Sequence, residues 1–93
     1  MSYLLKDPDA VLDYLVDWGA EYLGSDELLT SDWSVSPEED GGVLIAGSEF
    51  DGRTATVKAS GGVPGRIYRL VNEVVLGSGR IDSRSVTLRV EKR

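Results

Sequence analysis

The stretch KDPDAVLDYLVDW, residues 6–18, decides the fold, because its aspartates and apolar residues fit more than one structure. A calcium-binding loop of the EF-hand type requires glycine at its sixth position and glutamate at its twelfth. A loop beginning at Asp7 would place Leu12 and Trp18 at those two positions. The calcium loop is therefore excluded, and the choice lies between a helix and a strand.

The apolar residues of this stretch recur at a spacing that favours a helix. Asp7 is a suitable N-cap, Pro8 suits the first helical position, and the helical pattern runs to a stop at Gly24. A strand explains the same residues by alternation, and it leaves only Val11 and Leu15 as apolar residues on the solvent face. The residues that would then face the core are Leu12, Tyr14, Val16 and Trp18. Periodicity alone favours the helix.

Beyond this opening stretch, the sequence has the pattern of short strands separated by turns. Apolar and polar residues alternate in residues 28–35 and 53–60. Clusters of glycine with proline, serine or acidic residues indicate turns at 36–42, 61–65 and 77–79. Five β segments about ten residues apart are typical of a sandwich or a small barrel, and the last two are expected to form a hairpin.

Apolar residues at alternate positions of these segments are the candidates for the core. They are Trp33, Tyr68, Leu70, Val86 and Leu88. Tyr68 follows a glycine-rich turn, where an immunoglobulin-like sandwich would carry a tyrosine corner, and an ordinary core tyrosine fits equally well. Arg84 falls on the apolar side of its segment, so we expect it at a strand end or beyond a bulge.

The composition of the chain bounds its chemistry. A length of 93 residues predicts one domain, residues 1–93, in which residues 1–8 form an extended lead-in. The chain has no cysteine and no histidine, which removes disulfides, thiolate and imidazole catalysis, and the usual ligands of zinc and copper. We therefore expect no enzyme activity, no cofactor and no metal site. The chain also lacks the apolar run of a signal peptide or a membrane span, so no membrane partner is expected.

Charge is distributed unevenly along the chain. The net charge is -6, but residues 1–51 carry 13 of the 16 acidic residues and a single base, whereas residues 52–93 carry the other 9 bases. Such a chain is a poor ligand for nucleic acid, which selects clustered cations. Acidic early strands could pair with basic late strands within the molecule. Alternatively, opposite faces of neighbouring copies could attract and direct head-to-tail assembly. An acidic mimic of nucleic acid is a weaker alternative, because it fits only the first half.

Four segments, taken in order, resemble a known family. They are KDPDAVLDYLVDW, SDELLTSDWSV, SGGVPGRIYRLVNEV and GRIDSRSVTLRV, and the resemblance runs from about Lys6 to Val90. The family consists of small proteins encoded among the structural genes of tailed bacteriophages and prophages, often labelled fibre-tail adaptor or minor virion proteins. It implies an all-β fold, an immunoglobulin-like antiparallel β-sandwich of about six to seven strands. The resemblance also implies a strand for residues 10–18, with a short helical turn near residues 19–24.

The function that the resemblance implies is that of a non-enzymatic virion protein, an adaptor that joins tail, fibre or neck components and is made in the host bacterial cytoplasm. Its partners would be other virion proteins, with a homo-oligomer in the particle as a further expectation, and neither nucleic acid nor a membrane. We expect the contact residues at the two ends of the chain: Lys6, Asp7, Asp9, Arg89, Lys92 and Arg93. The main alternative is a carbohydrate- or cell-surface-binding module of the same fold, although Trp18 and Trp33 are better explained as core residues.

Overall fold

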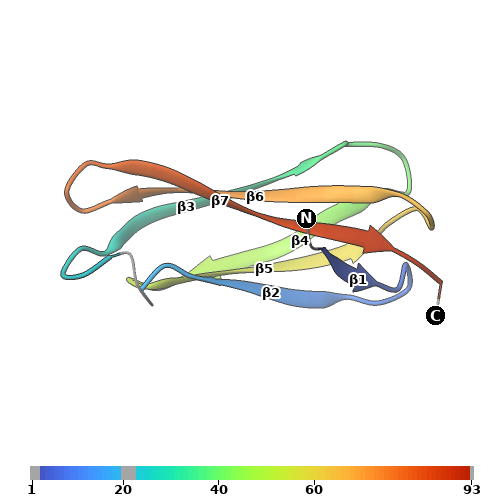
Figure 1. The fold of residues 1–93 in the computed structure, drawn as a ribbon, viewed down its shortest axis with the longest axis horizontal. Coiled ribbons are helices and arrows are strands. Elements are labelled where there is room, and N and C mark those ends of the chain that lie inside the picture. The colour runs from blue at the N-terminus through green and yellow to red at the C-terminus, as the bar shows by residue number, and fades with distance from the viewer. Residues whose placement is uncertain (1–2, 20–22, 93) are drawn as a thin grey trace.

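The computed structural model describes residues 3–19 and 23–92, which form an all-β sandwich of two sheets (Figure 1). The strands are β1 (Leu4–Lys6), β2 (Leu12–Asp17), β3 (Leu28–Ser36), β4 (Val43–Phe50), β5 (Thr54–Gly61), β6 (Ile67–Leu76) and β7 (Ile81–Val90). None of the residues described is helical. The helical turn predicted near residues 19–24 falls largely on residues 20–22, which lie outside the described part of the chain.

Strand β2 confirms the strand that the family resemblance implies, and the helix favoured by periodicity is wrong. The reason lies in the residues just before it. Asp7 does not cap a helix, because its Oδ1 accepts a hydrogen bond from the backbone N–H of Asp9 at 2.8 Å. The N–H of Ala10 donates to the Asp7 carbonyl at 3.1 Å, which closes a turn. Strand β2 then pairs with β5 along its whole length, so its backbone groups bond to a neighbouring strand.

The two sheets have the strand orders β1-β7-β6-β3 and β2-β5-β4. When β2 to β7 are lettered B to G, these are the G-F-C and B-E-D orders of an immunoglobulin sandwich. One strand departs from the antiparallel prediction, because β1 pairs in parallel with Leu88–Val90 of β7. Within the predicted lead-in over residues 1–8, Leu4–Lys6 form this strand. The open edge of β7 offers backbone groups that this segment satisfies by pairing.

The core lies between the sheets, where side chains of β2, β5, β6 and β7 meet. Four of the predicted core residues are fully buried, namely Trp18, Tyr68, Leu70 and Leu88, and Val16 is nearly so. Three others, Tyr14, Trp33 and Val86, are half-buried and pack against the margin of the core. The prediction that Leu12 faces the core is wrong, because 37% of its surface is exposed. It begins an edge strand, and no further strand covers it on the outer side.

Tyr68 forms a tyrosine corner at the start of β6. Its ring is fully buried, and its hydroxyl accepts a hydrogen bond from the backbone N–H of Val63 at 3.0 Å and donates to Glu39 Oε1 at 3.3 Å. The turn before it depends on glycine. Gly62 has a φ of 119°, and a Cβ at this position would lie 2.6 Å from a methyl carbon of Val90. The hydroxyl thus fixes the β5–β6 turn against the connection between β3 and β4.

We expect Tyr68→Phe to lower the free energy of unfolding by about 1–2 kcal/mol, because the N–H of Val63 loses its acceptor. The matched control is Tyr3→Phe, since the Tyr3 hydroxyl accepts only an exposed bond from Arg89 at 3.3 Å. Urea unfolding followed by circular dichroism measures both. Equal effects of the two substitutions would contradict the role given to the corner.

The predicted position of Arg84 at a strand end or beyond a bulge is also wrong. Arg84 lies within β7, opposite Asn72 of β6. Its guanidinium carbon lies 4.6 Å from the centre of the Trp18 ring, within the range of a cation–π contact. The Trp18 indole N–H donates to Asn72 Oδ1 at 2.9 Å, and Asn72 Nδ2 donates to Ser31 Oγ at 2.8 Å. A polar network therefore joins Trp18, at the end of β2, to the facing sheet, and the exposed Arg84 side chain covers the Trp18 ring.

Candidate functional site

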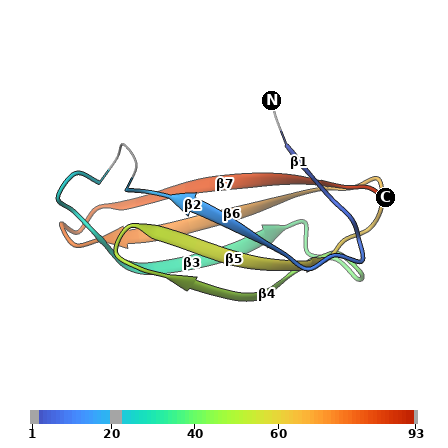
Figure 2. The same ribbon diagram turned by 90° about the horizontal axis from the view of Figure 1, so that it is seen from below.

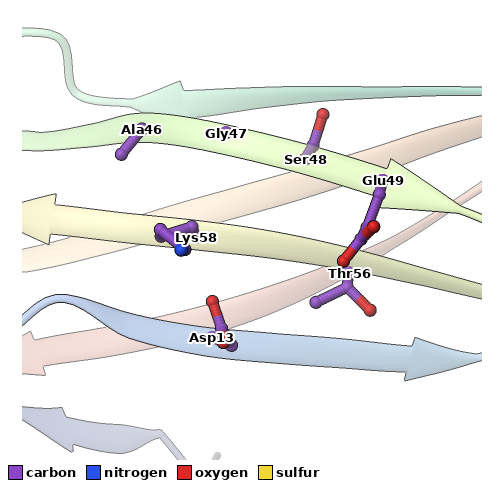
Figure 3. A pocket seen from close by; sticks show the side chains of 7 residues that line it. All are labelled: Asp13, Ala46, Gly47, Ser48, Glu49, Thr56 and Lys58. Carbon is purple, nitrogen blue, oxygen red and sulfur yellow. The ribbon is translucent and has the colours of Figure 1, made fainter.

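The outer face of the β2-β5-β4 sheet has a shallow hollow, lined by side chains from all three strands (Figure 3). Asp13, Glu49 and Lys58 are exposed there, and Gly47 adds no side chain. Asp13 and Lys58 are register partners on β2 and β5, a position at which opposite charges are favourable. This hollow lacks the enclosed surroundings in which catalytic groups usually act.

Acidic side chains gather nowhere into a metal centre in the part of the chain that the structure describes. Among residues 3–19 and 23–92, no group of three or more His, Cys, Asp or Glu side chains could hold a metal ion. In the acidic run 38–40, Glu39 turns to Tyr68 and lies 3.6 Å from Arg66 Nε. Over the same described ranges, no helix is long and apolar enough to cross a membrane.

One flank of the sandwich is apolar. Strand β1 is the outermost strand of one sheet and β2 that of the other, and β1 lies near the start of β2 (Figure 1). Six large apolar side chains on these strands and beside them are 37–59% exposed: Tyr3, Leu4, Leu5, Val11, Leu12 and Leu15. We call the two strands with these side chains the β1–β2 flank. It holds six of the eleven exposed large hydrophobic residues described, within 13 positions of sequence.

The same flank presents unpaired backbone. Strand β1 covers only Leu88–Val90, so residues 81–87 of β7 have no neighbouring strand on that side within the described ranges. Among the strands that the structure describes, β2 pairs only with β5. A small hollow lined by Tyr3, Leu4 and Thr87 lies beside the start of β1. Open strand edges next to apolar side chains are sites at which a strand of another protein can add.

The two ends of the described chain lie together beside this flank, because β1 pairs with the last strand. Lys92 Nζ is 2.9 Å from Asp9 Oδ2, and Arg89 Nε is 2.7 Å from Glu91 Oε1. Arg89 also donates to the Tyr3 hydroxyl at 3.3 Å. Of the predicted contact residues, Asp7, Asp9 and Lys92 thus lie near one another, Arg89 contacts Tyr3 and Glu91 instead, and Arg93 lies outside the described residues.

Lys6 does not belong with the other predicted contact residues, because its side chain is fully buried. Its ammonium group donates to the backbone carbonyls of Ala10 and Gly61, each at 2.7 Å, and of Asp7 at 3.0 Å. Burial lowers the pKa of Lys6, and the carboxylates of Asp7 and Asp9 offset part of that effect. The lysine therefore joins the β1–β2 connection to the β5–β6 turn, and its role is structural.

The fold and its surface define a small β-sandwich with open strand edges and exposed apolar side chains. Comparison with known families is more specific, since a family model described as podophage GP4 fiber-tail adaptor protein gp77 matches residues 6–89. The chain belongs to this fibre-tail adaptor family, as its sequence resemblance indicated, and is a structural adaptor protein of a phage. No curated protein matches the chain.

The apolar residues of the flank were not among the contact residues predicted from the sequence, which are charged. Leu4 and Leu5 fall in the segment predicted as a lead-in, where apolar residues carry no pattern. Val11 and Leu15 do carry a signal, because a strand over this stretch leaves them as apolar residues on its solvent face. Both are more than half exposed in the structure.

Proposed function

We propose that this adaptor is a non-enzymatic virion component that joins tail, fibre or neck proteins through its β1–β2 flank. It is made in the cytoplasm of the host bacterium and then built into the particle. The observation that carries the proposal is the concentration of exposed apolar side chains beside two open strand edges. An adaptor needs such a surface, because burial of apolar area supplies most of the free energy of association.

The binding mode follows from the chemistry of the flank. A strand of the partner protein pairs with the open edge of β7 or β2, and its side chains cover Leu5 and Leu15. The charged pairs Asp9–Lys92 and Arg89–Glu91 form a polar rim around this apolar centre. Rim charges mainly select the partner and speed its approach, whereas the covered leucines hold it.

We expect Leu5→Asp and Leu15→Asp each to weaken capture of the virion partner at least about tenfold, because each places a carboxylate in an interface that excludes water. The matched control is Leu29→Asp, which alters an apolar residue that is 56% exposed and belongs to β3, at the opposite edge of the sheet from β1. The measurement is capture by the immobilised full-length protein from disassembled phage particles, with mass spectrometry of the bound proteins. Unchanged capture by both leucine variants would show that the flank is not the binding surface.

The virion assignment itself has a separate test in the composition of purified particles. Mass spectrometry should find this protein in them at a constant ratio to the tail proteins. Its absence from infectious particles would end the proposal, whatever the flank variants do.

The carbohydrate-binding alternative gains no support from the described aromatic residues. Sugar-binding platforms present exposed rings, but Trp18 is fully buried and Trp33 is half-buried. A glycan array should therefore show no saturable binding. Binding that is lost on changing Tyr3 or Phe50, the exposed rings described, would favour the alternative instead.

A further inference from the structure

Two aspartates of this chain are each followed by a glycine, and the turns that contain them lie at opposite ends of strand β4 (Figure 2). Asp40 lies in the turn before β4, and Asp51 lies in the turn after it. An aspartate before glycine can rearrange without an enzyme, because glycine has no side chain to keep its backbone nitrogen away from the carboxyl carbon. The two turns therefore carry the same reactive pair of residues in different structural surroundings.

The rearrangement is an acyl transfer within the chain. The backbone nitrogen of the glycine bonds to the side-chain carboxyl carbon of the aspartate, and a cyclic succinimide forms as a water molecule leaves. Water then opens the ring. Attack on the main-chain carbonyl gives isoaspartate, in which the chain runs through Cβ, and attack on the other carbonyl restores aspartate. Water is lost and regained, so no other reactant is required. The carboxyl group reacts in its protonated form, because a carboxylate is a poor electrophile.

Hydrogen bonds restrain Asp51. Its Oδ1 accepts from the backbone N–H of Arg53 at 2.8 Å, from that of Thr54 at 2.7 Å and from the Thr54 hydroxyl at 3.1 Å. The bonds to these backbone N–H groups, that of Arg53 first, lower the pKa of Asp51. Attack by the nitrogen of Gly52 therefore has to break these bonds, and it needs a proton that the carboxylate rarely holds.

Asp40 lacks such restraints. Its side chain is exposed and makes no hydrogen bond or ion pair within the part of the chain that the structure describes. The N–H of Gly41, which is the nucleophile, makes no hydrogen bond with the described residues either. The turn is closed by its other members, since the N–H of Gly42 donates to the carbonyl of Glu39 at 3.0 Å. Both reacting groups of this pair are therefore unbonded.

We propose that Asp40 is a site of spontaneous conversion to isoaspartate, and that the hydrogen bonds at Asp51 prevent the same reaction there. The conversion adds the Cβ of Asp40 to the main chain, within the turn that packs against the tyrosine corner. The carbonyl of Gly41 accepts a hydrogen bond from the N–H of Gly62 at 3.0 Å, and that bond joins this turn to the β5–β6 turn. The modification should therefore loosen the contact between the two turns. The proposal does not depend on the virion role or on the β1–β2 flank.

The test is incubation of the full-length protein for several weeks in warm, mildly acidic buffer made with ¹⁸O water, followed by digestion and mass spectrometry. Passage through the succinimide exchanges a carboxyl oxygen, so ¹⁸O marks each aspartate that has reacted, and electron-transfer fragmentation distinguishes isoaspartate from aspartate. We expect at least about tenfold more ¹⁸O at Asp40 than at Asp51, because the hydrogen bonds of Asp51 must break before it reacts. In the chain unfolded with guanidinium, the two aspartates should react at similar rates.

Two variants separate the reaction from its prevention. Asp40→Glu should abolish ¹⁸O uptake at position 40, because glutamate would have to close a larger ring. Thr54→Val removes one hydrogen bond to Asp51 and should raise ¹⁸O uptake there about two- to tenfold, with no change at Asp40. In ¹⁵N spectra, the Gly62 amide signal should shift as isoaspartate accumulates. Equal uptake by both aspartates in the folded protein, or none at Asp40 under conditions in which the unfolded chain reacts, would overturn the proposal.

Discussion

Trp18→Ala is expected to lower the free energy of unfolding by about 3–5 kcal/mol, the range for removing a large aromatic side chain from a core. The side chain is fully buried, and its cluster includes Val16, Leu28 and Val74. The substitution also removes the donor bonded to Asn72. A domain of this size has about 5–14 kcal/mol of stability in total, so the substitution should remove a large share of it.

The matched control is Trp33→Ala, because Trp33 is only half-buried and its N–H has no partner to lose. We expect a clearly smaller loss for this variant. Urea unfolding followed by far-ultraviolet circular dichroism gives both values, because that signal comes mainly from the backbone. If the two substitutions cost the same, Trp18 would not be the centre of the core.

Lys6→Met is expected to lower the free energy of unfolding by about 2–4 kcal/mol, because the buried carbonyls of Ala10 and Gly61 lose their donor. Methionine has a side chain of similar length, so the lost free energy of unfolding reports on the hydrogen bonds more than on packing. The matched control is Lys92→Met, which removes an exposed lysine paired with Asp9 and should change stability little. A large effect of Lys92→Met, or none of Lys6→Met, would contradict the structural role of Lys6.

The pH dependence of the same variant tests the buried state of Lys6. Burial lowers its pKa in the folded protein below 10.5, the ordinary lysine value that holds in the unfolded chain. Between those two pKa values the unfolded chain binds more protons than the folded protein. The contribution of Lys6 to the free energy of unfolding therefore rises with pH in that window. The difference in unfolding free energy between the wild type and Lys6→Met should therefore grow as pH rises towards 10.5. A flat difference would mean that the amine is solvated.

The later strands could be predicted from sequence, because their residues alternate and glycine-rich turns separate them. The position of Tyr68 after such a turn was enough to suggest the corner that the structure shows. Residues 6–18 could not be settled in this way, since the same apolar residues satisfy both a helical period and a strand period. The Asp7 turn decides between them, and a lone Asp-Pro-Asp sequence is equally good as a helix start.

Two charged residues show why the rest could not be predicted. Lysine and arginine are rarely buried, so sequence reasoning places Lys6 on a contact surface and Arg84 at a strand end. In the structure, the Lys6 ammonium group donates to the carbonyl of Gly61, which is 55 positions away in sequence. Arg84 lies over the ring of Trp18, which follows the edge strand β2 of the other sheet. Such partners appear only when the sheets assemble. The β1–β2 flank depends on assembly in the same way, because its two strands belong to different sheets.

The central claim is that this adaptor docks in the particle through the β1–β2 flank, and photo-crosslinking in assembled phage tests it most directly. A photoreactive amino acid replaces Leu15 on the flank in one variant and Glu73, an exposed residue of β6 in the other sheet, in another. After irradiation of purified particles, we expect the Leu15 position to crosslink to a different virion protein and the Glu73 position to give no such product. Crosslinks from Glu73 alone, with none from Leu15 in particles that contain the protein, would contradict the claim.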